Sequence, residues 1–382
     1  MWGAAQAERG DMALGVARPR PMEERARGAN RGDSTILKPG PSTRTGDARE
    51  ERATPVLWRA ARKLRRTLGD LRNDMRGLCE PEVYVSSTRP AQGDTVAVFV
   101  SYGKPRTPIG LAQNALSEWT EGLVRITFDG ENIPAYPVRR RRLGRPPART
   151  YRALIPVTPL DEPGSRTLVV QVNDGRYRRA PVHVPCVIQA RPFLTQHVWL
   201  GEAKRGNLSP SAVESARVES WRQRRSPRQL WRGPLSIPSA GEITTHYGQK
   251  RFYNGRFAEN YYHRGIDYAA ERGAPVRSPA NGKVVLVGRE SHGFRLHGNC
   301  LGLDHGQGVA SLMLHLDEIA PGMRPGAHVK KDQVIGTVGN TGCSTGPHLH
   351  WGLFVNGKSV DPAPWMQRAA SGEGANPRRL LW

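Results

Sequence analysis

The sequence predicts a mainly β protein, in which two β-rich domains follow a disordered basic segment. The chain has 382 residues, which is long enough for two domains with extensions. It contains 42 Gly and 31 Pro, which suit the turns of β-rich domains better than long helices. Its hydrophobic content of 37% is low for a chain that is folded throughout. We therefore expect poorly ordered segments beside the two domains.

The N-terminal part is basic and lacks the pattern of a β domain. Residues 1–55 are rich in Arg, Gly, Pro, Ser and Thr and have no hydrophobic period, so we expect a disordered basic segment. Over residues 56–79, apolar side chains recur at helical spacing among Arg and Lys, which predicts an amphipathic helix. Such a helix can contact a membrane surface. Docking on the next domain is the other interpretation, and the one that we favour.

Residues 80–190 contain short runs of Val, Ile and aromatic residues, separated by Gly, Pro, Asn and Asp. The predicted strands are Glu82–Ser87, Thr95–Tyr102, Val124–Phe128, Tyr151–Val157, Thr167–Val172 and Ala180–Val184. Several of them alternate apolar and polar residues, so we expect a small antiparallel β-sandwich of immunoglobulin-like type. Nothing in this region resembles a catalytic motif. The basic cluster at residues 139–142 is expected to be a solvated loop, although it can contact a polyanion.

The second β-rich domain is expected over residues 235–366, after a linker at 191–234 with a polar helix over Ser209–Arg225 and before a loose tail at 367–382. Its predicted strands are Gly282–Val287, Asn299–Asp304, Gly308–Leu314, Val334–Val338 and His348–Val355. The Asn-Gly pairs at Asn281 and Asn356 each predict a β-hairpin turn.

Four cysteines are present, and none of them forms a Cys-x-x-Cys pair, which argues against a thiolate zinc knuckle. Cys79 and Cys186 flank the predicted sandwich, so a disulfide between them is geometrically possible, and free buried thiols are an equal alternative. Cys300 lies in an apolar strand and is expected in the core. No apolar run reaches 18 residues, and the first thirty residues lack the apolar stretch of a secretory signal.

The net charge of +23 predicts attraction to polyanions such as nucleic acid, anionic lipid or a negatively charged cell wall. The charge can also serve solubility alone. A nucleic-acid-binding protein would need a known binding module or interleaved aromatic and basic residues, and the sequence has neither. We therefore expect no specific nucleic-acid partner.

A constellation of histidines and one aspartate occupies the last third of the chain. His263 and Asp267 are four apart, and Gly265 between them favours an extended or turning segment in which they share a face. His348 and His350 are two apart on a predicted strand and point to the same side. Two ligands from the first segment and one from the second would leave an open position for water, as in a catalytic zinc site. One histidine of the pair would then remain outside the ligand set.

Residues 240–365 resemble the lysostaphin-type (LytM-type) zinc endopeptidase domain, metallopeptidase family 23. The stretches that carry the resemblance are His263–Ala269, Gly273–Val276, Ala280–Val284, Leu303–Gly306, Leu314–Leu316, Val338–Gly342, Ser344–Gly352 and Val360–Pro362. The resemblance covers about a third of the chain and implies a β-rich fold of the duplicated-hybrid-motif type. The upstream region is similar, more loosely, to a β-domain that precedes this peptidase in some envelope proteins.

The resemblance implies one zinc ion per chain, bound by His263, Asp267 and His350. His315 and His348 would be the unligated catalytic histidines. A neutral imidazole can take a proton from the attacking water, and a protonated one can stabilise the oxyanion or protonate the leaving amine. We favour His348 as the base and His315 as the oxyanion partner, and the two roles can be exchanged.

The family cuts peptide cross-links of bacterial peptidoglycan, so the resemblance implies that substrate and a location in the cell envelope. An anionic wall polymer or membrane surface is a further expected partner. The alternative is a catalytically silent regulator of other wall hydrolases, because some relatives lose their metal ligands.

Other residues near the motifs are expected to have lesser roles. The stretches 251–262 and 290–298 are expected to wall the cleft, and three tyrosines of the first stretch can contact the peptide: Tyr253, Tyr261 and Tyr262. We expect no metal ligand among His246, His292, His297 and His305, the last of which is expected in a structural turn. Cys343 stands where the family often has a basic residue, which bears on substrate preference, and its thiolate is a conceivable competitor for zinc.

Overall fold

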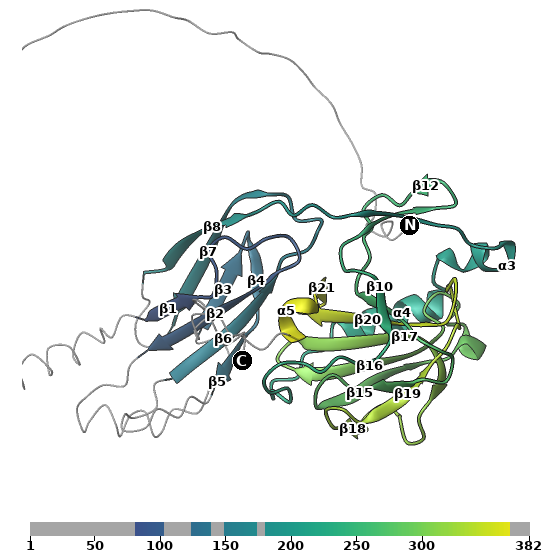
Figure 1. The fold of residues 1–382 in the computed structure, drawn as a ribbon. Helices are drawn as coiled ribbons and strands as arrows, with labels where there is room; N and C mark the ends of the chain where they lie inside the picture. The colour runs from purple at the N-terminus through teal and green to yellow at the C-terminus, as the bar shows by residue number, and fades with distance from the viewer. Residues whose placement is uncertain (1–80, 103–123, 139–148, 174–179, 367–382) are drawn as a thin grey trace, which may run out of the picture. The chain divides into compact units, whose positions relative to one another are not determined.

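A computed structural model describes residues 81–102, 124–138, 149–173 and 180–366 of the chain. The described residues are mainly β, as the sequence predicts (Figure 1). The expected disordered segment, the amphipathic helix, the basic cluster at 139–142, Cys79 and the tail lie outside these ranges. No helix among the described residues is long and apolar enough to cross a membrane.

The N-terminal β region consists of two antiparallel four-stranded sheets. The first has the order β1 (Glu82–Val85), β2 (Thr95–Tyr102), β6 (Arg149–Pro156) and β5 (Ala135–Val138), and the second has the order β4 (Glu131–Ile133), β3 (Val124–Phe128), β7 (Gly164–Val172) and β8 (Val182–Ile188). Alternate residues such as Val98, Ile126 and Val170 share one hydrophobic core. The region is therefore a β-sandwich, because a sheet that is apolar on one face is stable only when that face is covered.

The segment between the sandwich and the large sheet is ordered and packed. It contains β9 (Thr195–Val198), α3 (Glu202–Arg205), the 3₁₀ turn η1 (Gly206–Leu208) and α4 (Ala212–Arg222). The predicted polar helix is confirmed as α4, which begins at a capping box between Ser211 and Glu214. Val218 and Trp221 of α4 lie in a core with Phe354, whose ring makes an edge-on contact with Trp221. The helix is thus anchored to the second domain by its apolar face.

The C-terminal domain is built on a ten-stranded sheet with short flanking elements. In chain order these are β10 (Glu242–Thr245), β11 (Lys250–Tyr253), β12 (Arg256–Phe257), β13 (Ile266–Ala269), β14 (Pro275–Arg277), β15 (Gly282–Gly288), η2 (Glu290–His292), β16 (Asn299–Gly306), β17 (Val309–Ile319), β18 (His328–Val329), β19 (Val334–Val338), β20 (His348–Val355), β21 (Lys358–Val360) and α5 (Ala363–Met366). The main path of the sheet is β10-β13-β20-β17-β16-β15-β18. The strands β12, β11 and β9 form a separate three-stranded sheet.

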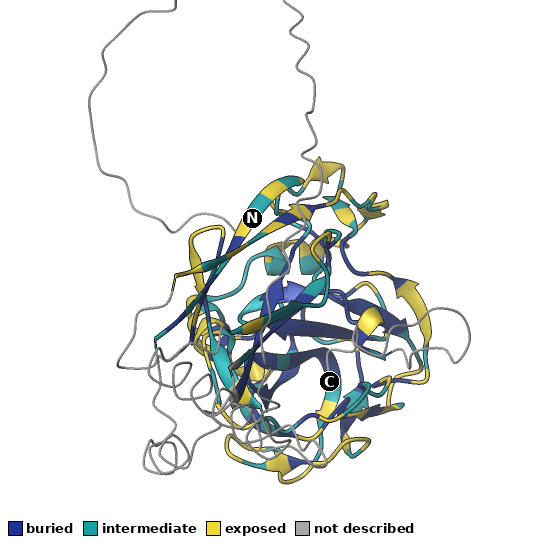
Figure 2. Ribbon diagram, turned by 90° about the vertical axis from the view of Figure 1, so that its left-hand side faces the viewer, coloured by how far each residue is buried: buried dark blue, intermediate teal, exposed yellow. Residues whose placement is uncertain are grey.

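The central strands of the large sheet are buried on both faces (Figure 2). On β20, Leu349, Trp351 and Leu353 are part of the main core of the domain. Because side chains alternate along a strand, His348 and His350 project from the opposite face. The prediction that His348 and His350 point to the same side of one strand is therefore confirmed.

The two Asn-Gly expectations have different outcomes. Asn356 and Gly357 have φ of 49° and 84° and join the antiparallel strands β20 and β21, so this hairpin is confirmed. The expectation at Asn281 is wrong, because β14 pairs with β19 and not with β15. The side chain of Asn281 instead accepts a hydrogen bond from the Lys331 backbone.

Candidate metal centre

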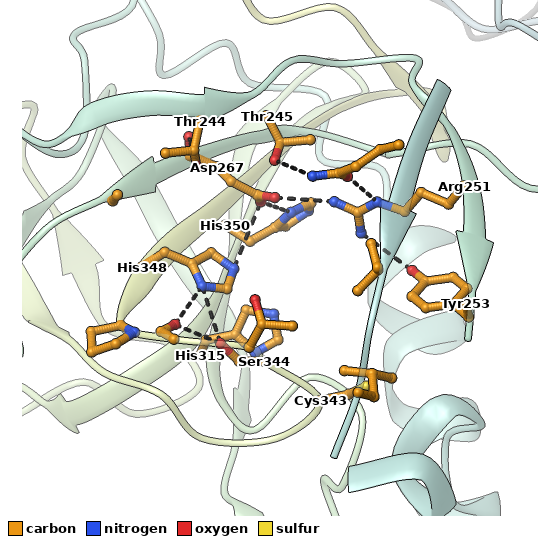
Figure 3. A pocket seen from close by; sticks show the side chains of 17 residues that line it. Thr244, Thr245, Arg251, Tyr253, Asp267, His315, Cys343, Ser344, His348 and His350 are labelled. Atoms are coloured by element: carbon orange, nitrogen blue, oxygen red, sulfur yellow. Dashed lines mark hydrogen bonds and ion pairs between the residues drawn. The ribbon is translucent and has the colours of Figure 1, made fainter. Parts of the chain in front are cut away.

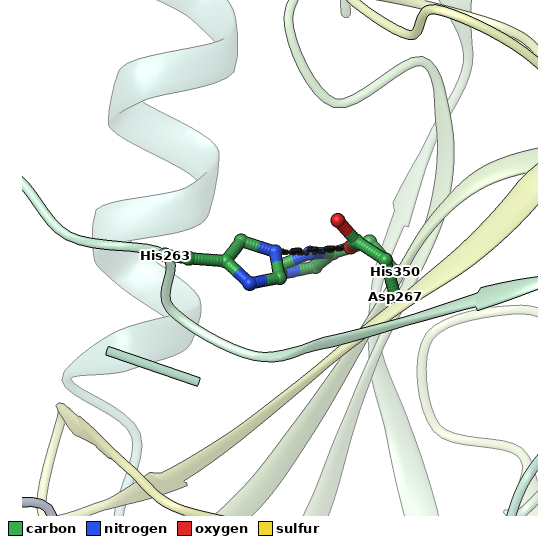
Figure 4. Close-up of side chains that lie close together, drawn as sticks. All are labelled: His263, Asp267 and His350. Carbon is green, nitrogen blue, oxygen red and sulfur yellow. Dashed lines mark hydrogen bonds and ion pairs between the residues drawn. The ribbon is translucent and has the colours of Figure 1, made fainter. Parts of the chain in front are cut away.

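Three side chains meet on one side of β13 and β20. Asp267 on β13 and His350 on β20 are direct Cα partners across the antiparallel pair. His263 lies in the segment before β13, and its backbone is fixed by N–H donation to the Gln249 carbonyl. The ligand atoms of the three residues all lie within 4.8 Å of one another, and all three side chains are buried (Figure 4). The predicted ligand set is therefore together in space.

Gly265 makes this approach possible. A Cβ atom at this position would lie 2.3 Å from the Trp351 carbonyl oxygen and 2.9 Å from Cε1 of His350. Contacts this short are not tolerated, so only glycine allows the chain before β13 to pass beside β20. The missing side chain thus makes room for the neighbouring strand β20.

The hydrogen-bond pattern at His263 shows why the cluster suits a cation. Nδ1 of His263 donates to the carbonyl of His246 over 2.9 Å, so Nε2 of the neutral ring has a free lone pair. That lone pair faces Oδ1 of Asp267 at 3.0 Å and Nδ1 of His350 at 2.9 Å. Two imidazole nitrogens and a carboxylate oxygen that lie this close together are suitable ligands for one shared cation. A backbone carbonyl behind the ring is the usual outer partner of a metal-bound histidine.

The charge states agree with this donor set. Burial lowers the pKa of His263 to about 4 and also lowers the pKa of His350. Burial opposes ionisation of Asp267, but the adjacent His263 and His350 hold the pKa of this carboxyl well below its usual range. Two neutral imidazoles and one carboxylate are the N and O ligands that zinc takes in three-ligand sites.

His348 and His315 lie beside the cluster without belonging to it. Nε2 of His348 is 3.9 Å from Oδ1 of Asp267, and the rings of His315 and His348 have centroids 4.8 Å apart. Nδ1 of His348 donates to the Gly346 carbonyl, and Nδ1 of His315 donates to the Thr341 carbonyl, each over 2.8 Å. In the neutral form, each ring therefore presents Nε2 as an acceptor. Burial, together with His348 and His350, lowers the pKa of His315 well below its usual value.

The side chains of Asp267, His315, His348 and His350 border a cavity of about 340 Å³ (Figure 3). One wall consists of Arg251 and Tyr253 from β11, and the linker adds Gln196, Val198 and Leu200. The loop of residues 343–347 forms another part of the lining. The expectation that residues from 251 onward border the cleft is thus confirmed for Arg251 and Tyr253. The linker contribution was not anticipated, since β9 is a short strand without a motif.

Other candidate residues have structural surroundings. The hydroxyl of Tyr261 accepts a hydrogen bond from the hydroxyl of Tyr253. Tyr262 is buried, and its hydroxyl shares a hydrogen bond with the hydroxyl of Ser359. His305 is fully buried near the end of β16, where its ring forms hydrogen bonds with the Asn281 carbonyl and the Ser311 hydroxyl, so it lies in a strand and not in a turn.

Burial raises the pKa of Cys343, so its thiol is protonated beside the cavity. Cys186 and Cys300 are buried and form no disulfide with another described cysteine, and Cys300 lies in the core as expected.

The fold and site together define a mainly β protein with a buried His/Asp/His cluster, suited to a metal ion, at the edge of a cavity. The model of peptidase family M23 matches residues 261–362, so this part of the chain is an M23 peptidase domain. The family resemblance inferred from the motifs is confirmed.

Several known proteins are similar to this chain. The DD-carboxypeptidase/endopeptidase Mpg of Neisseria meningitidis is 42% identical over 100 residues, which is 26% of this chain and 22% of that protein. The peptidoglycan DD-endopeptidase ShyB of Vibrio cholerae is 27% identical over 258 residues, or 65% of this chain and 55% of that protein. The chain thus spans about a fifth to a half of the length of these relatives. A crystal structure of a putative M23 peptidase from Pseudomonas aeruginosa shares 24% identity, with a TM-score of 0.47, over 72% of this chain and 94% of the other.

Proposed function

We propose that this protein is a zinc metalloendopeptidase that hydrolyses peptide cross-links of peptidoglycan in the cell envelope. The observation that carries the proposal is the convergence of Nε2 of His263, Oδ1 of Asp267 and Nδ1 of His350, three potential ligand atoms that lie close together in a buried site. The names of similar proteins support the substrate class, since ShyB is a peptidoglycan DD-endopeptidase. Lysostaphin of Staphylococcus simulans, which is 35% identical over 116 residues, is a further relative.

His263, Asp267 and His350 would hold the ion at a position that borders the cavity. When bound there, zinc supplies Lewis-acid polarisation of the scissile carbonyl and lowers the pKa of water toward neutrality. The cavity lies on the side of the cluster where His348 and His315 are found, so a peptide in it would meet both imidazoles.

His315 and His348 would transfer the protons of hydrolysis at their Nε2 atoms. One imidazole accepts a proton as the water oxygen bonds to the carbonyl carbon, and an imidazolium then gives a proton to the amide nitrogen as the C–N bond breaks. The carbonyls of Thr341 and Gly346 hold the opposite ring nitrogens, which fixes the orientation of each ring. Both rings present the same free nitrogen, so the geometry is compatible with either order of the two roles.

The proposal is tested by digestion of purified peptidoglycan with the full-length protein, followed by mass analysis of the fragments. We expect new amino termini that vanish with a chelator, return with zinc and are not produced by His350→Ala. Soluble fragments that form regardless of chelator would contradict the metal mechanism. A protein that binds zinc but releases no fragments, and instead increases the activity of another wall hydrolase, would support the regulator alternative.

A further inference from the structure

The two carboxylate oxygens of Asp267 have different partners. Oδ1 faces His263 and His350, whereas Oδ2 accepts a hydrogen bond from the guanidinium of Arg251 over 3.1 Å (Figure 3). Both members of this ion pair are largely buried, with side-chain exposures of 13% for Arg251 and 9% for Asp267. Only one oxygen of the carboxylate is therefore directed at the candidate metal position.

Arg251 is itself held in place by two further contacts. Its Nε donates to the side-chain carbonyl of Gln196 over 2.9 Å, and its Nη1 donates to the hydroxyl of Tyr253 over 3.2 Å. With the bond to Asp267, all three guanidinium nitrogens are engaged. This arrangement suits a group that orients a protein carboxylate better than one that waits for a charged substrate.

Gln196 connects this contact to the linker. Gln196 on β9 and Arg251 on β11 are Cα partners in the parallel pair of the small sheet. The Gln196 amide also donates to the hydroxyl of Thr245 on β10 over 3.2 Å. The contacts thus run from Thr245 through Gln196 and Arg251 to Asp267. Apart from Asp267, each of these residues lies outside the 261–362 stretch that matches the family.

We propose that Arg251, held by Gln196, is a positioning residue that fixes Asp267 as a one-oxygen ligand and thereby sets the affinity of the site for zinc. This inference rests on the proposed zinc site. Without the guanidinium, the buried Oδ2 would lose its partner, and the carboxylate would be free to turn both oxygens toward the ion. Groups that orient a ligand from behind typically contribute a factor of about 10–100 to metal affinity.

The test is the zinc dissociation constant of the full-length protein, measured by competition with a chelating indicator. We expect Arg251→Met to weaken zinc binding about 10- to 100-fold, and Gln196→Ala to weaken it by a smaller factor. Arg251→Lys keeps the charge but not the planar fork, so its affinity should fall between those of the wild type and Arg251→Met. The matched control is Arg256→Met, because Arg256 is an exposed residue on the adjoining strand β12.

A second measurement reports the ligand geometry independently of activity. In the cobalt(II)-loaded protein, a change of Asp267 from one to two bound oxygens raises the coordination number and weakens the visible absorption. We expect this change in Arg251→Met and not in Arg256→Met. Arg251→Lys and Gln196→Ala both keep a positive charge beside Asp267. These two variants therefore still test the positioning role if Arg251→Met does not fold.

The outcomes separate this inference from the proposed function. If the wild type binds zinc and the Arg251 and Gln196 variants bind it equally well with an unchanged cobalt spectrum, the positioning role is refuted and the zinc site stands. If the wild type binds no zinc under the same conditions, the proposed function fails, and this inference fails with it.

Discussion

Glu214 on α4 and His297 in the loop before β16 form a buried pair with a distance of 2.6 Å between Oε1 and Nδ1. Glu214 is fully buried and also accepts hydrogen bonds from the backbone N–H groups of Leu296 and His297. The His297 carbonyl in turn accepts the backbone N–H of His315, whose φ of 63° lies in the left-handed region. A helix of the linker is thus connected through two hydrogen-bonded steps to a candidate catalytic histidine.

Replacement of Glu214 by Ala is expected to lower the free energy of unfolding by about 3–5 kcal/mol, because it removes a buried carboxylate that accepts three hydrogen bonds, one from the His297 ring and two from backbone N–H groups. Urea denaturation measures this change. The control is Glu219→Ala, since Glu219 is on the same helix with a side-chain exposure of 51%, and its replacement should change stability by about 0.5 kcal/mol or less. Equal effects of the two substitutions would contradict the structural role of Glu214.

Replacement of His350 by Ala is expected to abolish both hydrolysis and zinc-dependent stabilisation. A ligand that binds only the native state raises stability by about 2.7 kcal/mol at 100 times its dissociation constant, so the melting temperature of the wild type should rise with zinc. His350→Ala should show no such rise. His328→Ala is a suitable control because His328 is exposed on β18. A rise of the same size in His350→Ala would exclude this histidine from the ligand set.

The His315→Ala and His348→Ala variants are expected to retain zinc and lose activity. Neither ring belongs to the group of convergent ligand atoms, so the zinc dissociation constant should stay close to that of the wild type. Loss of a general acid or base typically costs a factor of about 10²–10⁴ in rate. The rate of single-turnover cleavage of a cross-linked peptide is measured as a function of pH. The resulting pH–rate profile shows whether each substitution removes the acidic or the basic limb. Loss of zinc from either variant would instead make that histidine a ligand.

Acidification is expected to destabilise the metal-free protein between about pH 6.5 and 4. Burial lowers the pKa of His263 from 6.5 to about 4, so in this range the unfolded state binds a proton that the folded state does not. Stability is therefore lost as the pH falls, by up to about 1.4 kcal/mol per pH unit for this group, and the loss levels off below the folded pKa. Urea unfolding in the presence of a chelator measures the slope. In His263→Gln the slope should be shallower, and an unchanged slope would contradict this account.

Gly265→Ala is expected to destabilise the domain and weaken zinc binding together. The added Cβ would meet the Trp351 carbonyl at 2.3 Å, so β13 or β20 must move, and these strands carry Asp267 and His350. Gly206→Ala is the control, because Gly206 has φ of −67° and no heavy atom within 4 Å of its ideal Cβ position. Thermal unfolding and zinc competition measure both effects. A Gly265→Ala protein as stable as Gly206→Ala would show that the strands can separate at no cost.

Much of the local structure was predictable because it depends on neighbours in the sequence. The bounds of β2, β3, β19 and β20 agree with the predicted strands, since alternation and flanking turn residues are local signals. The short strands β9, β11 and β13 were not predicted, because a strand of four residues carries too little periodicity. At Asn281 a turn signal was present, but the following strand pairs elsewhere, so local chemistry did not decide the partner.

The sequence by itself determined which histidines and which aspartate are the candidates for the site, and that His348 and His350 share a face of one strand. Only the tertiary structure decided that β13 pairs with β20 in the register that sets Asp267 opposite His350. It also decided that Arg251 holds the second oxygen of Asp267 and that Gln196 holds Arg251. The physical reason is that side-chain alternation is a property of each strand alone, whereas strand partners and register depend on how distant segments pack together.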